Sequence, residues 1–450
     1  FRPSPLLTEG QERGGERGGV RLNRYFQPIE MHYRSSVVVW AAGRGVLQWL
    51  QNYPFGSTMR LREGIYLKSL YFTIWGAIGA FWPFIYVYYR TEIGLSGTEI
   101  GFVVMASAAM GTLSAPLWGM LNDRLGRTRV LLTIQALGLA AVCLAVSQLH
   151  TFISILVAMG LFSVFSSPIM PLLDSTTLGV LGERRDLYGS YRAWGTIGFV
   201  ITCTLAGFLV ERIGLGLIFP AYAAGVLVFW LLSLRLPERR AARGGPSRLA
   251  GLRQMVRQRA WLIFMISVFL LWFSVMGAFA FLGIVIVEMG GAQRLVGLSS
   301  TIAALTEIPT FQYSARLLRR FGPPIMLTIA IGVYAFRLLL YAFMPSPTWV
   351  LWLALLQGAS YGFFLVAAVA YANELAPDAL KSTAQGLLVS VMSLANLGAG
   401  LAGGWLLDFI GRRGLFLAMM ATCLVALGVF MAGQRLNRPA VERPALTADR

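Results

Sequence analysis

The chain has 450 residues, of which 56% are hydrophobic and 13% are charged, and its formal net charge is +18. About a quarter of the residues in an ordinary soluble domain are charged, so this composition excludes that class and indicates a protein embedded in a lipid bilayer. The basic residues are scattered through short breaks between apolar runs and form no stripe with interleaved aromatics, which argues against a nucleic-acid partner.

The first 58 residues differ from the rest of the chain. They begin without methionine, are rich in Arg and Gly, and hold one short apolar patch at 35–50 that is interrupted by Gly43, Arg44 and Gly45. A membrane span needs about 20 apolar residues, and a signal peptide needs a small-residue cleavage site, so neither is predicted here. We expect residues 1–58 to be a disordered or misassigned extension ahead of a true start at Met59.

From Tyr66 onward, apolar runs alternate with short polar breaks, and each run is long enough to cross a hydrocarbon core of about 30 Å as a helix. The longest break is rich in arginine and divides the spans into two sets of six, the pattern of a duplicated bundle. The sequence therefore predicts an all-α membrane protein with an N-terminal bundle at 59–236, a basic linker at 237–259, a C-terminal bundle at 260–434 and a tail at 435–450. Its twelve spans are expected at 66–89, 98–121, 129–149, 151–176, 188–211, 215–236, 260–287, 295–318, 323–344, 348–372, 381–407 and 414–434.

Arginine is distributed unevenly between the two sets of breaks. The breaks after even-numbered spans carry most of the arginines, and cytoplasmic loops are enriched in basic residues. We therefore expect a multi-pass inner-membrane protein with both termini in the cytoplasm.

The break after the second span reads GMLNDRLGRTR from Gly119 onward. Its glycines allow a tight turn, and its aspartate can pair with arginine or cap a helix. The stretch resembles the Gly-x-x-x-Asp-Arg-x-Gly-Arg loop of the major facilitator superfamily, which implies two six-helix halves that rock around one site. The resemblance implies a role in the inward/outward equilibrium, without solute contact, for Gly119, Asp123, Arg124, Gly126 and Arg127. A solvated basic turn is the alternative.

A degenerate copy of this motif, GWLLDFIGRRG, occurs at 404–414 in the second half. It falls on the opposite side of the membrane in the predicted topology, so we assign it no function.

Ionisable residues inside spans are costly and are candidates for function. Asp174 lies near the end of span four and Arg192 opens span five, so the two can approach each other and face a central cavity. The stretch YGSYR that ends at Arg192 resembles the oligosaccharide/proton symporter branch typified by lactose permease, and nucleoside and phenylpropionate symporters. The resemblance implies solute contacts for Asp174, Arg192 and Phe199, the last in place of a stacking tryptophan. For Asp174 and Arg192, an ion pair that locks the cytoplasmic ends of the two helices is the alternative. Tyr71 and Trp75 are further candidates for the cavity wall, and a lipid-facing position is the alternative.

Glu307 in span eight and Arg337 in span nine lie at similar depths on consecutive antiparallel helices. A carboxylate in apolar surroundings takes up a proton more readily than one in water, and a nearby arginine opposes this, so movement of Arg337 can couple protonation to conformation. Lactose permease likewise has an acid on helix eight and an arginine on helix nine. Glu307 falls about one turn from that position, and span ten lacks the charged residues of that permease. A purely structural ion pair is the alternative.

The remaining residues bear on other classes of protein. Three isolated cysteines fall in apolar runs and both histidines, His32 and His150, fall outside the spans, so no disulfide framework, metal site or histidine relay is predicted. No nucleotide-binding glycine loop and no catalytic constellation occur, so we predict no cofactor and no enzyme activity.

We therefore expect a monomeric secondary transporter that moves a small polar or aromatic solute by alternating access, with a proton as the coupling ion. A drug/proton antiporter and a nontransporting sensor on the same fold are the alternatives. Span five lacks the Gly-Pro-rich signature of exporters, which favours symport.

Overall fold

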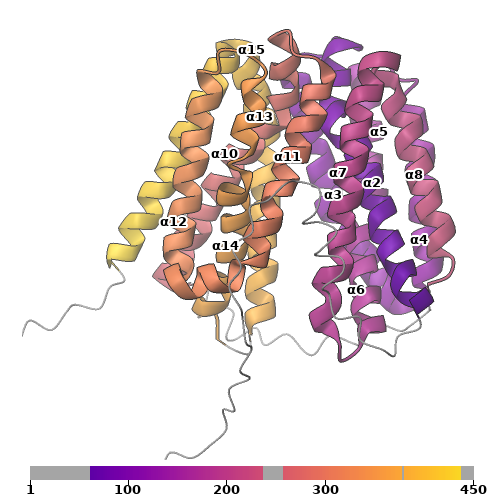
Figure 1. Cartoon of the computed structure of the whole chain (residues 1–450), viewed down its shortest axis with the longest axis horizontal. Coiled ribbons are helices and arrows are strands. Elements are labelled where there is room, and N and C mark those ends of the chain that lie inside the picture. The colour runs from indigo at the N-terminus through magenta and orange to yellow at the C-terminus, as the bar shows by residue number, and fades with distance from the viewer. Residues whose placement is uncertain (1–60, 237–256, 378–379, 437–450) are drawn as a thin grey trace, which may run out of the picture. The chain divides into compact units, whose positions relative to one another are not determined.

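The computed structural model describes residues 61–236, 257–377 and 380–436. The predicted extension at 1–58, most of the linker and most of the tail lie outside the described residues. Residues 59–450 form one unit, and every regular element described in it is a helix (Figure 1).

The N-terminal half contains seven long or half-length helices and two short 3-10 turns. The fourth predicted span is divided into two helices by a turn at Ser167 and Pro168, because proline has no N–H to continue the ladder. The elements are α2 (Leu61–Thr91), α3 (Gly97–Leu125), α4 (Thr128–Val146), α5 (Phe152–Ser166), α6 (Ile169–Leu181), η1 (Arg185–Leu187), α7 (Tyr188–Ile213), η2 (Leu215–Leu217) and α8 (Ile218–Ser233).

The C-terminal half is built from longer helices with two internal kinks and one π-helical turn. Its elements are α10 (Arg259–Glu288), α11 (Gln293–Gln312), α12 (Ser314–Ala342), α13 (Trp349–Ala354), the π turn η3 (Gly358–Gly362), α14 (Phe363–Leu375) and α15 (Lys381–Leu436). The sequence predicts that span eight extends to residue 318, but α11 ends at Gln312. The basic residues Arg319 and Arg320 belong to a short exposed segment before the kink at Gly322.

Twelve spans result, as the sequence predicts. Ten helical stretches in the described part of the chain are long and apolar enough to cross a membrane, with α5 and α6 counted as one stretch and the segment from α13 to α14 as another. The longest of these, α15, is two spans, because Gly411 has φ 68° and interrupts the helix there. A positive φ of this kind is a conformation that glycine adopts without strain. The twelfth span is α11, which is less apolar than the others because it carries Glu307 and several hydroxyl side chains.

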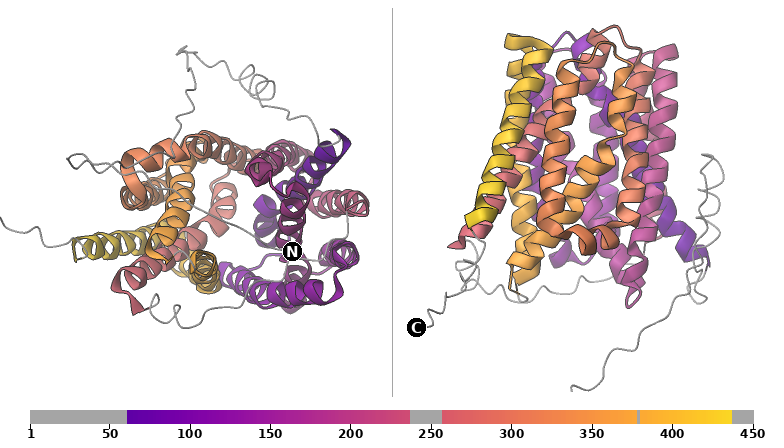
Figure 2. Two further views of the ribbon diagram at one scale, coloured as in Figure 1. Left: turned by 90° about the horizontal axis from the view of Figure 1, so that it is seen from below. Right: turned by 60° about the vertical axis from the view of Figure 1, so that its left-hand side comes forward.

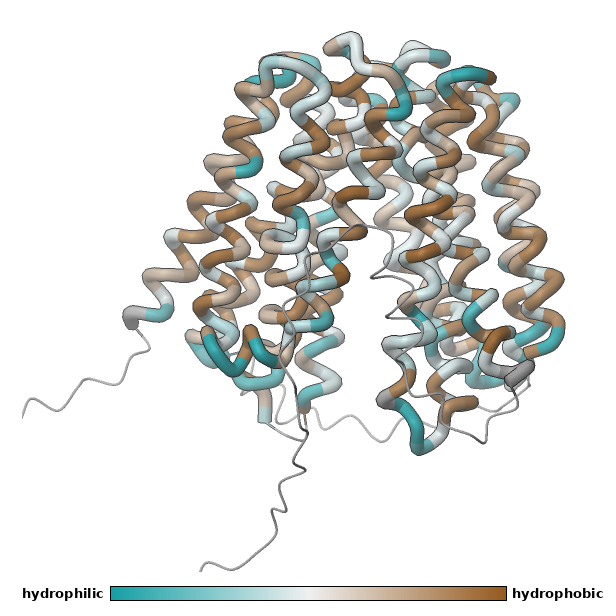
Figure 3. The backbone as a smooth tube through the Cα atoms, viewed as in Figure 1, coloured by the Kyte–Doolittle hydropathy of each residue, from teal (hydrophilic) through white to brown (hydrophobic). Residues whose placement is uncertain are grey.

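The described chain begins with α2 and ends with α15, and the start of α2 and the last turn of α15 lie at the same end of the helices (Figure 1). We call this the terminal end, and we call the opposite end, where α2 meets α3 and α15 kinks at Gly411, the far end. Hydrophobic residues cover the length of the helices, and hydrophilic ones gather toward their ends (Figure 3). Large apolar side chains are exposed along the outer faces, as lipid contact requires; they include Leu113, Leu117, Val157, Leu205, Leu231 and Val389.

Two seams join the halves (Figure 2). In the first, α3 packs against α15 through glycines: a Cβ on Gly97 would lie 2.7 Å from the Gly404 carbonyl oxygen, and one on Gly101 would lie 2.6 Å from that of Gly400. In the second, α7 packs against α11, where Thr204 and Thr301 share a hydrogen bond of 2.8 Å. Small residues let the backbones approach closely, so each seam is a direct helix-to-helix contact.

The far end is held together by charges that cross between the halves. Arg90 of α2 pairs with Glu288 of α10 at 2.9 Å, and Arg294 of α11 pairs with Glu211 of α7 at 3.1 Å. Asp408 of α15 accepts hydrogen bonds from the backbone N–H groups of Gly97 and Thr98, at 2.8 and 2.7 Å. Among the described residues, each ion pair between the halves lies at the far end, so the halves are closed there.

These contacts correct the treatment of the motif copy at 404–414, to which the sequence analysis assigned no function. Its aspartate, Asp408, lies at the start of α3, where a helix presents unpaired N–H groups and partial positive charge. Arg90 lies 3.6 Å from the same carboxylate. The copy therefore contributes to closure of the far end.

Candidate functional site

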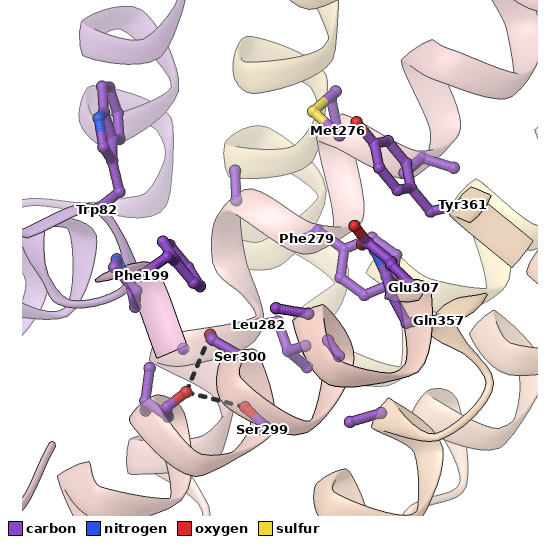
Figure 4. Close-up of a pocket in the computed structure, with 18 of the residues that line it drawn as sticks. Trp82, Phe199, Met276, Phe279, Leu282, Ser299, Ser300, Glu307, Gln357 and Tyr361 are labelled. Atoms are coloured by element: carbon purple, nitrogen blue, oxygen red, sulfur yellow. Dashed lines mark hydrogen bonds between the residues drawn. The ribbon is translucent and has the colours of Figure 1, made fainter. Parts of the chain in front are cut away.

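A cavity of about 610 Å³ lies between the two halves. The N-terminal half contributes α2 and α7 to its wall, and the C-terminal half contributes α10, α11, α12 and the segment from α13 to α14. Trp82 and Phe199 lie on one side of the cavity, and Glu307, Gln357 and Tyr361 lie on the other (Figure 4). Most of the wall is aromatic or aliphatic; its aromatic members are Trp75, Trp82, Tyr86, Phe199, Trp272, Phe279, Phe311, Tyr334, Tyr341 and Tyr361.

Arg192 is the charged group of the N-terminal wall. Its guanidinium lies 5.5 Å from the centre of the Trp75 ring and 3.7 Å from a carboxylate oxygen of Asp174, and 45% of its side chain is exposed. The indole of Trp75 fits against α7 because position 195 is glycine, where a Cβ would lie 2.5 Å from the ring. Arg192 is therefore held loosely, by an ion pair and a ring face, and stays accessible from the cavity.

Tyr71 and Asp174 differ from the other predicted solute contacts, because neither belongs to the cavity wall. The Tyr71 side chain is fully buried, and its hydroxyl donates to Asp174 at 2.7 Å and lies 3.3 Å from the hydroxyl of Thr177. The sequence makes Tyr71 a candidate for the cavity wall with a lipid-facing position as the alternative, whereas in the structure it is buried and donates to Asp174. Tyr71 orients Asp174, which in turn lies beside Arg192.

Arg337 is the cationic group of the C-terminal wall and is 2% exposed. Its guanidinium donates to Gln357, to the hydroxyl of Tyr341 at 3.1 Å and to that of Ser360 at 3.4 Å. It also lies 4.7 Å from the centre of the Phe279 ring. The two terminal nitrogens of the cation thus have oxygen acceptors and its face lies on an aromatic ring, while its buried Nε–H has no hydrogen-bond partner among the described residues.

Glu307 does not pair directly with Arg337 among the ion pairs of the described residues. The amide nitrogen of Gln357 donates to Glu307 at 3.1 Å, while the amide oxygen of the same side chain accepts from Arg337. Gln357 therefore bridges the two groups that the sequence analysis paired. Gln357 is not ionisable, so the rarity of charges in spans does not single it out; the signal in the sequence is a single amide in the apolar span ten.

The loop motif after α3 lies at the terminal end. Gly126 ends α3 with φ 62°, and its N–H donates to the Asn122 carbonyl, which makes the tight turn that the motif predicts. Asp123 is exposed and has no hydrogen bond or ion pair to another residue of the described segments. Gly119, Arg124 and Arg127 also lie away from the cavity wall. Their predicted conformational role stays a prediction.

The fold and a cavity between two six-helix halves define a membrane transporter, and sequence comparisons agree. The MFS_1 like family matches residues 65–418. The maltose permease of Geobacillus stearothermophilus is 32% identical over 83% of this chain and 95% of its own length. A probable 3-phenylpropionic acid transporter of Escherichia coli is 27% identical over 82% of this chain and 97% of its own length.

Solved structures show the same fold. The nucleoside transporter NupG superposes with a TM-score of 0.74 at 17% identity, covering 83% of this chain and 99% of NupG. The chain belongs to the MFS_1 like family and is a multi-pass transporter of the major facilitator type. The predicted fold, the predicted family and the prediction that the chain is a transporter rather than an enzyme are confirmed.

Proposed function

We propose that this transporter is a proton-coupled importer of a neutral oligosaccharide of disaccharide size. The observation that carries this proposal is the charge balance of the cavity. Arg192 is matched by Asp174 at 3.7 Å, and Arg337 is matched by Glu307 through Gln357. Because each of the two arginines is balanced by a carboxylate, an uncharged solute enters without leaving a buried ion unpaired.

The wall of the cavity also suits a sugar. Sugar rings present apolar C–H faces that stack on aromatic side chains, and hydroxyl groups that need hydrogen-bond partners. The cavity supplies rings from both halves, including Trp75, Phe199 and Trp272. The indole N–H groups of Trp75 and Trp272 are buried without a partner in the described structure, and they are donors that a sugar hydroxyl can satisfy after a small rearrangement.

Size and relatives support the same class. A cavity of about 610 Å³ is in the range that holds ligands of drug size, to which disaccharides belong. The relative that is 32% identical is named a maltose permease.

Proton coupling is proposed at Glu307. This carboxylate lines the cavity and is half-buried. It accepts a hydrogen bond from Gln357, and Gln357 in turn accepts one from Arg337. A carboxylate there can carry a proton and change its interaction with Arg337 as it does so. We propose further that the terminal end, with its basic loops, faces the cytoplasm, so that the described state opens inward.

The test uses purified protein in proteoliposomes, with solute-induced external alkalinisation measured for maltose, sucrose, uridine and 3-phenylpropionate. We expect alkalinisation with a disaccharide and none with Glu307→Gln, while counterflow of labelled disaccharide persists in that variant. Gln148→Leu, in an exposed loop at the far end, is the control and should match wild type. Disaccharide counterflow without any alkalinisation would refute proton coupling.

An aromatic carboxylate is the second candidate, because one relative is named a probable 3-phenylpropionic acid transporter and the cavity is rich in rings. An anion would need Arg192 to exchange Asp174 for the solute. Transport of 3-phenylpropionate but of no disaccharide would establish this alternative, and proton-driven export of hydrophobic cations would establish an antiporter.

A further inference from the structure

Gln357 stands between the two charges of the C-terminal wall. Its carbonyl oxygen faces the guanidinium of Arg337, and its NH₂ group faces the carboxylate of Glu307. The opposite orientation of the amide would place NH₂ against the guanidinium and oxygen against the carboxylate, so that a donor would face a donor and an acceptor would face an acceptor. The charges on Glu307 and Arg337 therefore determine which way the amide points.

We propose that Gln357 is a positioning residue for proton coupling: it transmits the protonation of Glu307 to Arg337 and thereby to the conformation of the C-terminal half. This inference rests on the proposed proton coupling at Glu307.

Protonation of Glu307 weakens one bond of the bridge and removes the ionised partner of Arg337. The bond from the Gln357 NH₂ group to Glu307 loses its ionic character and about half of its strength. Arg337 then keeps its full charge, at 2% exposure, and its hydrogen-bond partners among the described residues are all neutral: the hydroxyls of Tyr341 and Ser360 and the amide of Gln357. A buried cation without an ionised partner is strongly unfavourable, so this arrangement loses stability relative to one in which Arg337 moves.

The backbone next to Gln357 is specialised for this position. The turn η3 that follows it is π-helical, a rare local form that is found frequently at functional sites. Gly358 donates its N–H to the hydroxyl of Thr306 at 3.2 Å, and a Cβ on Gly362 would lie 2.8 Å from Thr310. These contacts bring η3 against α11 and place Gln357 in the space between Glu307 and α12.

The groups that face the bridge come from four elements. Besides Arg337 and Glu307, they include the rings of Tyr334 and Tyr361 at the cavity wall and Phe279 of α10. Among the described residues, no other carboxylate and no histidine lines the cavity, so a conformational response to protons in this part of the protein is assigned to Glu307.

The first experiment separates coupling from transport. Labelled maltose is measured in proteoliposomes in two modes, counterflow without a gradient and accumulation driven by a pH gradient, for wild type, Gln357→Leu, Gln357→Glu and the control Gln148→Leu. We expect Gln357→Leu to lower driven accumulation about tenfold or more, because the variant loses a charge-assisted hydrogen bond. Its rate of counterflow should stay within about threefold of the wild-type rate. Gln357→Glu should also uncouple, because it gives Arg337 a carboxylate that is independent of Glu307.

The second experiment does not need the solute. Spin labels at Glu183→Cys and Tyr313→Cys, both exposed at the terminal end, report the distance between the halves by electron–electron resonance in a background without native cysteines. We expect the wild-type distance distribution to change between acidic and alkaline buffer, and the distributions of Gln357→Leu and Glu307→Gln not to change.

A pH response in Gln357→Leu equal to that of wild type would overturn the proposal, as would a wild-type distribution that ignores pH. Failure of maltose transport in wild type would instead count against the proposed solute. Driven accumulation and counterflow that fall together in Gln357→Leu, beside an unchanged pH response, would mark Gln357 as a solute contact and also overturn the proposal.

Discussion

Arg337 and Arg192 line the same cavity, but their surroundings differ. Arg337 is 2% exposed and has polar partners on two helical segments of its own half, whereas the Arg192 side chain is 45% exposed and has one carboxylate at 3.7 Å and one ring face. A guanidinium with several fixed acceptors is restrained, and one with a single long ion pair can exchange that partner.

From this difference we infer that the two halves have different functions in transport. The C-terminal arginine belongs to a network that responds to charge, and the N-terminal arginine is available to a solute. Substitutions should therefore separate into effects on stability and coupling at Arg337 and effects on solute affinity at Arg192.

The largest expected effect is that of Arg337→Leu. Removing the cation leaves Glu307 half-buried without its bridge partner and leaves Tyr341 and Ser360 without a donor, so we expect a stability loss of about 3–5 kcal/mol and no transport. Thermal unfolding in detergent measures the first and counterflow the second. Arg413→Leu, exposed at the far end, is the control and should cost less than about 0.5 kcal/mol.

Arg192→Ala should have the next largest effect, and it should fall on affinity. Loss of a charged hydrogen-bond donor to a solute hydroxyl raises the half-saturation concentration about tenfold to a hundredfold. We expect the thermal midpoint to stay near wild type, because the side chain is largely exposed. An unfolding midpoint lowered as far as in Arg337→Leu would contradict the comparison.

Tyr71→Phe tests whether Asp174 must be oriented. The change removes the hydroxyl that donates to Asp174 at 2.7 Å and leaves the ring in place. We expect the half-saturation concentration to rise about threefold to tenfold, since hydrogen bonds to charged groups contribute about 1.5 kcal/mol or somewhat less when one end is solvated. Equal affinity in the variant and wild type would show that Asp174 is positioned without Tyr71.

Tyr341→Phe is the matched change on the other arginine, and its effect on solute affinity should be the smallest of the four. Arg337 loses one hydrogen bond of 3.1 Å and keeps those to Gln357 and Ser360, so we expect a cost of about 1 kcal/mol in unfolding. Affinity for the solute should change less than in Tyr71→Phe. A larger change in affinity than in stability would show that Tyr341 contacts the solute.

The sequence predicts the fold well because each span is read from local composition. The predicted ends of the spans differ from the observed helix ends where composition and backbone geometry disagree, as at Pro168 within span four and at the basic segment that follows Gln312. A π turn has no compositional signature, so η3 was not predicted.

The site is predicted less completely than the fold. Buried charges are rare in spans, and this singles out Arg337, Glu307, Arg192 and Asp174 from the sequence alone. Which of them touch depends on helix rotation, which a residue list does not contain. Neutral residues that complete the site, Gln357 and Tyr71 among them, acquire their roles from packing across helices.

Asp408 has a consequence for how this transporter tolerates sequence variation. Its carboxylate accepts hydrogen bonds from the backbone N–H groups of Gly97 and Thr98, which almost every amino acid supplies, and a further one from the Thr98 hydroxyl at 2.8 Å. A change of side chain at position 98 can remove the hydroxyl bond, but it leaves both main-chain bonds in place. Proline removes the N–H, and a side chain at position 97 collides with Gly404. Closure of the far end is thus vulnerable at few positions, and genetic variants that hold the protein open on that side should concentrate at Asp408, Gly97 and Gly404.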